Sequence, residues 1–277
     1  MNETGIITLI LILTNGIVTY KGLKDHLFLD KYSFNVDQVL VNKDYKRLVT
    51  SGFLHVDWTH FIFNMITLYL FSKNLEALIG IPAYIILYFI SLIGGNLFAL
   101  YIHRHHADYS AIGASGAISG LVFASIGLFP GMSIGFILLP VFIPAWLFGI
   151  VYVLYSIYGI KNKKDNIGHE AHLGGGIIGL ITAILMQPGI LTVNYLPIVL
   201  ILIPSLLFLF LIIRKPHLLI VSNPFSRSKG LQTVEDKYHT DKVSKQTELD
   251  KILDKINKKG YDKLSKKEKE RLKELSK

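Results

Sequence analysis

The sequence predicts an all-α protein, a polytopic bundle of membrane helices, from its composition and its pattern of apolar stretches. Of the 277 residues, 51% are hydrophobic and only 18% are charged, and the mean hydropathy is +0.44. A soluble domain carries more charge than this. Seven apolar stretches also approach the roughly 20 residues that a helix needs to cross a bilayer. The chain has no cysteine, which excludes disulfides, thiolate nucleophiles and cysteine-bound zinc.

The seven predicted spans follow one another with short connections, except after the first. No Lys or Arg precedes the first span and no small-x-small cleavage site follows it, so we expect it to stay in place rather than act as a signal peptide. We assign residues 1–190 to a six-helix core and residues 191–216 to a seventh transmembrane helix. The predicted spans are Gly5–Tyr20, Val56–Phe71, Ala83–Ile102, Ser115–Pro130, Ala145–Ile160, His169–Met186 and Tyr195–Ile213.

Two connections are unusual. The loop between the first two spans mixes apolar residues with charges, which indicates a segment lying in the membrane interface. Met132–Pro144 is apolar but contains Pro140 and Pro144, so we expect a re-entrant or interfacial connection rather than a helix.

The tail carries most of the positive charge. Residues 215–277 hold 17 of the 29 Lys and Arg and 10 of the 20 Asp and Glu, within a formal net charge of +9. We predict a polar linker over residues 217–247 and a basic helical hairpin over 248–277, with Gly260 as a helix stop. The hairpin suits a protein partner or anionic lipid headgroups. Because the basic character belongs to the tail, a nucleic-acid function for the whole chain is not predicted.

Polar groups within membrane spans are costly and indicate function, and four polar side chains in the predicted spans stand out. His60 and Asn64 are four residues apart and share one helical face. Ser115 begins the fourth span, and His172 begins the sixth. The alternative for Ser115 is packing, because Gly116 and Gly120 form a small-xxx-small pattern that brings membrane helices together.

These residue types suit acyl transfer. Serine is a weak nucleophile until a base removes its proton, and histidine is the usual base near neutral pH. Attack on a carbonyl creates an oxyanion, which donors already in place must stabilise. His60, Asn64 and the backbone N–H of Ser115 can donate to it. A glycine stripe after His172, at Gly175 and Gly179, would let the serine helix approach.

Three segments resemble, in order, the motifs of the rhomboid intramembrane serine proteases, over about residues 1–190. The resemblance implies Ser115 as nucleophile, His172 as general base and then acid, and His60 with Asn64 at the oxyanion. It also implies transmembrane segments of other proteins as substrates, and neither metal nor cofactor. The matching segments are Arg47–His55 with His60-Phe61-Ile62-Phe63-Asn64, Gly113-Ala114-Ser115-Gly116-Ala117, and Ala171-His172-Leu173-Gly174-Gly175 with Gly179.

The chain departs from this pattern at Ser119. Many rhomboid proteases carry an aromatic residue four positions after the nucleophile, stacked on the catalytic histidine. We therefore expect His172 either to lack a stacking partner or to find a different one.

Other functions remain as alternatives. A rhomboid-like pseudoprotease would bind and escort membrane-protein clients without cleaving them. A transporter would show an inverted repeat, and none is evident. A loop cluster of three histidines and Asp108 offers metal ligands, and His169 with His172 approaches a metalloprotease motif whose histidines should be four apart, not three. The loop cluster is His103, His105, His106 and Asp108.

The membrane and the orientation are less determined by the sequence. Lys and Arg concentrate after the first, third and fifth spans and in the tail, which predicts an outside N-terminus and a cytoplasmic tail. Bacterial rhomboids usually have the reverse orientation, which we prefer slightly. We expect a bacterial inner membrane.

Overall fold

The computed structural model describes residues 5–136, 139–162 and 167–214, together with a few separate residues between 252 and 272. The chain divides into two units, Met1–Val221 and Ser222–Lys277. The predicted linker and basic hairpin of the tail lie almost wholly outside the described residues.

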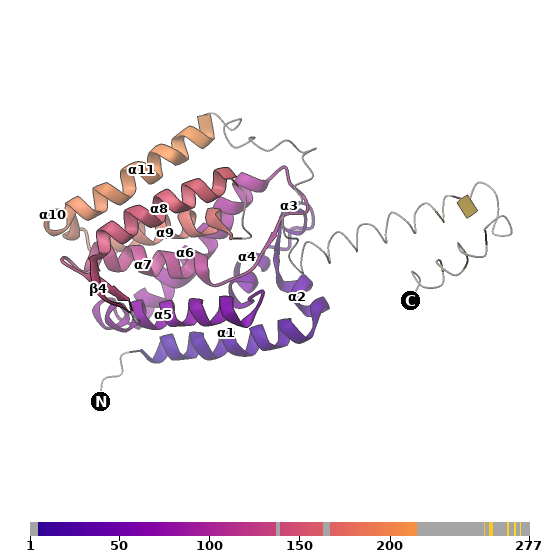
Figure 1. Ribbon diagram of the computed structural model, residues 1–277, viewed down its shortest axis with the longest axis horizontal. Helices are drawn as coiled ribbons and strands as arrows, with labels where there is room; N and C mark the ends of the chain where they lie inside the picture. The colour runs from indigo at the N-terminus through magenta and orange to yellow at the C-terminus, as the bar shows by residue number, and fades with distance from the viewer. Residues whose placement is uncertain are drawn as a thin grey trace. The chain divides into compact units, whose positions relative to one another are not determined.

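The first unit is a helical bundle with two small strand pairs (Figure 1). Among its described residues, seven long helices form the bundle: α1 (Ile6–Lys24), α5 (Trp58–Ile79), α6 (Ile81–His103), α7 (Ser115–Leu128), α8 (Ala145–Asn162), α9 (His169–Met186) and α11 (Tyr195–Arg214). The connections contain the short helices α2 (His26–Tyr32), α3 (Val36–Leu40), α4 (Arg47–Thr50) and α10 (Ile190–Val193), the 3-10 turn Ser51–Phe53, and the strands β1 (Phe34–Asn35), β2 (Ser110–Ala111), β3 (Ser133–Phe136) and β4 (Leu139–Pro144).

Each of the seven predicted spans overlaps one long helix, so the predicted all-α membrane bundle is confirmed. Within the described residues, α1, α6, α9 and α11 are long and apolar enough to cross a membrane by length and composition. The helices α7 and α8 are apolar but shorter. The 14 residues of α7 reach only about 21 Å at 1.5 Å per residue. Thirteen of them are buried, so neighbouring helices, not lipid, surround this helix.

The apolar segment before α8 is an antiparallel hairpin. Strands β3 and β4 pair Ser133 with Pro144 and Ile134 with Ile143. Proline has no N–H to donate and breaks a helix, but an edge strand tolerates it. The sequence therefore excluded a helix here correctly, but it did not reveal the strand pairing.

The long loop after α1 has a small core of its own. Phe34, Val36 and Val39 are almost fully buried, with Leu48 beside them. Arg47 Nη1 donates to the carbonyl oxygens of Asp30 and Ser33, at 2.7 Å each. The apolar residues that suggested a loop lying in the interface are thus partly explained by this cluster.

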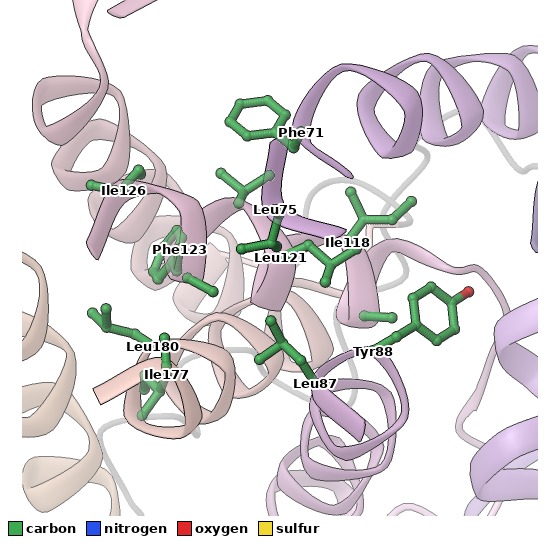
Figure 2. Packing of buried hydrophobic residues seen from close by; sticks show 14 of the residues in the cluster. Phe71, Leu75, Leu87, Tyr88, Ile118, Leu121, Phe123, Ile126, Ile177 and Leu180 are labelled. Atoms are coloured by element: carbon green, nitrogen blue, oxygen red, sulfur yellow. The ribbon is translucent and has the colours of Figure 1, made fainter. Parts of the chain in front are cut away.

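The helices α6, α7 and α9 form the centre of the bundle, and α7 packs against the other two. In Figure 1, α1 and α5 lie toward one side of this centre and α11 toward the other. Large apolar side chains from α5, α6, α7 and α9 meet in the main core (Figure 2). They include Leu75, Leu87, Leu121 and Leu180, each completely buried.

Candidate active site

Ser115 is the first residue of α7 and stands at the end of an unusual turn. Gly113 has a φ of 138°, in the region that favours glycine, and its N–H donates to the carbonyl of Ser51 at 3.0 Å. The first helical hydrogen bond of α7 runs from Ile118 N to Ala114 O. The backbone N–H groups of the first turn, beginning with Ser115, therefore have no acceptor within the helix and give this end positive character.

His172 lies in the first turn of α9 and meets the hydroxyl of Ser115. The distance from His172 Nε2 to Ser115 Oγ is 2.6 Å, although the two residues are 57 positions apart. With the imidazole neutral and its proton on Nδ1, Nε2 accepts the hydroxyl proton. Both side chains are half-buried. This geometry suits proton transfer from serine to histidine.

Glycines let α7 and α9 approach closely enough for this contact. A Cβ on Gly116 would lie 3.3 Å from the carbonyl oxygen of Ala171. A Cβ on Gly175 would collide with the backbone oxygen of Gly116, and one on Gly179 would collide with the backbone of Gly120. The predicted glycine stripe is therefore confirmed as a backbone-to-backbone contact.

His60 reaches the same place from α5. A Cβ on Gly113 would lie 2.9 Å and 3.1 Å from His60 Cε1 and Nε2, and 3.5 Å from Ser115 Oγ. The imidazole of His60 and the hydroxyl of Ser115 thus both lie next to Gly113. Asn64 lies one turn further along α5, and its Nδ2 donates to the carbonyl of His60 at 3.0 Å. One of its two amide protons is therefore used within the helix.

His55 supports His60 and was given no separate role by the sequence. Its side chain is fully buried, with Nδ1 at 2.8 Å from Thr19 Oγ1, and its ring packs edge-on against that of His60 at 4.9 Å. Burial, with a smaller contribution from the nearby His60, lowers the pKa of His55 to about 3. The ring is therefore neutral near pH 7. Only its place just before α5 could have indicated this role.

His172 does have an aromatic neighbour, Tyr152 of α8. The two ring centroids are 6.1 Å apart, with 21° between their planes. Ser119 bonds to this tyrosine, with 2.7 Å between Ser119 Oγ and Tyr152 OH. Of the two expectations at Ser119, the structure shows the second: the histidine has found a different partner, on a different helix.

The loop histidines form a clasp rather than a ligand set. His103 Nε2 lies 2.9 Å from Glu170 Oε1, and its ring stacks on Tyr109 with a centroid distance of 3.6 Å. His106 Nδ1 is 3.3 Å from His103 Nδ1. Across the described part of the chain, no three His, Cys, Asp or Glu side chains form a group that could hold a metal ion.

Comparison with known proteins gives a consistent result. The profile of the rhomboid domain matches residues 42–189, just over half of the chain, and that of a family of unknown function, DUF6576, matches residues 232–277.

Several curated relatives carry the rhomboid name, among them three from different organisms. "Rhomboid protein 1, mitochondrial" of Saccharomyces cerevisiae is 30% identical over 161 residues, 56% of this chain and 45% of its own. "RHOMBOID-like protein 12, mitochondrial" of Arabidopsis thaliana is 31% identical over 149 residues, 48% of this chain and 44% of its own. "Rhomboid protease AarA" of Providencia stuartii is 28% identical over 171 residues, 55% of this chain and 60% of its own. The chain thus spans about half the length of these relatives.

Proposed function

The chain belongs to the rhomboid family of integral membrane proteins, and on that premise we propose that it is an intramembrane serine protease. Its substrates are transmembrane segments of other membrane proteins, and its reaction is hydrolysis of a peptide bond within or near them. The observation that carries the proposal is the 2.6 Å contact between Ser115 Oγ and His172 Nε2.

Each residue of the site has a place in the proposed reaction. Ser115 Oγ attacks the peptide carbonyl while His172 Nε2 takes its proton. We assign the first-turn N–H groups of α7 and the His60 ring, which lies beside Gly113, as donors to the oxyanion, with Asn64 as a further candidate. His172 then returns the proton to the departing amine, and water attacks the acyl-enzyme with the same histidine as base.

The half-buried position of both side chains supports a site within the bundle. Water must reach the acyl-enzyme, whereas lipid must not enter the space between α5, α7 and α9. The short α7 favours this arrangement, because its serine end lies beside polar side chains and its remaining residues are buried. We further propose a bacterial cell membrane as the location, in keeping with the relative from Providencia stuartii.

Labelling with a fluorophosphonate, combined with cleavage of a model transmembrane substrate, tests the proposal. We expect Ser115→Ala to abolish labelling, and Ser115→Ala and His172→Ala each to lower cleavage by at least about 10³-fold. Ser125→Ala is the matched control, since Ser125 belongs to the same helix, is buried and lies about three turns from the dyad.

The outcomes separate the protease from a client-binding protein. Cleavage that survives Ser115→Ala would refute the dyad. A folded wild-type protein that binds transmembrane helices but neither reacts with the probe nor cleaves them would instead support the escort function.

A further inference from the structure

Tyr152 of α8 lies beside His172. Its ring lies nearly parallel to the imidazole, with 6.1 Å between centroids and 21° between planes. The other sides of the ring contact Phe123 of α7, edge-on at 5.7 Å, and Phe148 of α8 at 5.8 Å. The tyrosine ring therefore forms a wall of the histidine site that comes from neither catalytic helix.

The hydroxyl of Tyr152 is held by a directed chain of two hydrogen bonds. Ser119 Oγ lies 2.7 Å from the carbonyl oxygen of Ser115 and 2.7 Å from Tyr152 OH. A carbonyl only accepts, so Ser119 must donate its single hydroxyl proton to Ser115 O. Tyr152 must then donate to Ser119 Oγ. The phenol is thus fixed, through one serine, to the backbone of the proposed nucleophile itself.

The two hydrogen bonds and the ring contact together connect three helices at the dyad. Ser115 and Ser119 belong to α7, Tyr152 to α8 and His172 to α9. The distance between nucleophile and base is set by the glycine contact of α7 with α9, but that contact does not fix rotation of the imidazole about its side-chain bonds. The nearly parallel ring of Tyr152 limits this rotation of the imidazole. That ring is itself hydrogen-bonded, through Ser119, to the backbone of Ser115.

We propose that Tyr152, anchored by Ser119, is a positioning residue that orients His172 for proton transfer. The inference rests on the proposed protease function. It also gives Ser119 a role, since the small side chain leaves room for the ring from α8 and supplies the hydroxyl that holds it. A well-oriented base acts mainly on the chemical step, because loss of near-attack geometry lowers kcat without weakening substrate binding.

Steady-state cleavage by two minimal variants and their combination tests the proposal. Tyr152→Phe and Ser119→Ala each remove one oxygen and leave the packing nearly unchanged. We expect each to lower kcat by about threefold with KM unchanged, and the double variant to show the same loss, not the product, since both break one chain. Tyr152→Leu, which also removes the ring, should lower kcat by about thirtyfold.

Matched controls make the same chemical changes away from the dyad. Tyr158→Phe alters a tyrosine of α8 that is more than half exposed, and Ser125→Ala alters a buried serine of α7. Both should keep kcat and KM of the wild type. The thermal midpoint in detergent micelles is measured for every variant. If Tyr152→Leu does not fold, Tyr152→Phe and Ser119→Ala still test the proposal.

Three results would overturn the inference. The first is an unchanged kcat in folded Tyr152→Phe and Ser119→Ala. The second is a change in KM alone, and the third is a reduction of kcat in the double variant equal to the product of the two single reductions. Each requires an active wild type, so each leaves the protease function standing. A wild type that never cleaves would instead remove the proposed function and this inference with it.

Discussion

The contact between α7 and α9 differs in kind from the contact between α8 and α11. In the first, glycines bring two backbones together, so that a Cβ on Gly175 or Gly179 would collide with the main chain of α7. In the second, large apolar side chains leave an open cavity of about 300 Å³ on the side of the bundle. Leu207, one of the residues lining it, is 56% exposed.

The difference shows how the bundle can be rigid where the proposed chemistry occurs and looser elsewhere. Ser115 and His172 lie on the two helices whose backbones touch, which fixes the distance between them. Tyr152 and His60 come from helices on either side of that pair. The outer α11 packs mainly on α8 and supplies no residue to the site. Lipid can replace lost contacts on that outer surface, but nothing can replace them between α7 and α9.

The largest effect is expected from Gly175→Ala, which breaks the inner contact, that is, the contact between the backbones of α7 and α9. The new methyl group would meet the backbone oxygen of Gly116, which cannot rotate away as a side chain could. We expect more than about 3 kcal/mol of destabilisation. Because α9 must move away from α7, labelling of Ser115 should also be lost. The midpoint of an SDS titration and fluorophosphonate labelling measure the two effects.

Gly189→Ala is the control for the added methyl group. A Cβ there meets nothing within 4 Å, and the residue has an ordinary helical φ of −58°. It should retain both stability and labelling. A Gly175→Ala protein as stable and as reactive as this control would show that the inner contact is less rigid than its geometry indicates.

A smaller loss of stability is expected at the start of α9, where the carboxylate of Glu170 contacts the ring of His103. Glu170 is 5% exposed and its carboxylate lies 2.9 Å from His103 Nε2, so it joins the start of α9 to the end of α6. Glu170→Gln keeps the volume but removes the charge from a buried pair. We expect about 3 kcal/mol of destabilisation, measured by the same titration. His172 lies two residues further along, so labelling should slow as well.

The variant His103→Gln tests whether loss of the clasp, the contact between Glu170 and His103, causes the destabilisation in Glu170→Gln. If it is, the double variant should be little worse than either single variant, because both remove one interaction. Additive losses would mean that Glu170 stabilises α9 by a route that does not involve His103.

The sequence predicted the inner contact well because its information is local. Glycines four residues apart lie on one helical face wherever the helix packs, so Gly175 and Gly179 indicated a close approach from spacing alone. Ser115 and His172 stood out as polar residues at the starts of apolar spans, and the structure places them 2.6 Å apart.

What the sequence did not predict depends on how separate elements align. Tyr152 and Ser119 are 33 residues apart, and nothing in either segment marks the other as its partner. Glu170 and His103 are 67 residues apart, so the clasp was visible only as a cluster of loop histidines. The β3–β4 hairpin was hidden because its apolar run lacks the alternation typical of an amphipathic strand, and the prolines indicated only that a helix ends.

The smallest effect should come from the outer contact, through Leu207→Ala on α11. The side chain lines the cavity beside α8 and is more than half exposed, so lipid or detergent fills the space that it leaves. We expect less than about 1 kcal/mol of destabilisation and unchanged cleavage. Leu180→Ala makes the same change on α9, where the side chain is completely buried. It leaves a void that nothing fills, and should cost at least roughly 2 kcal/mol. Equal losses at the two positions would mean that α11 is held as firmly as the inner helices.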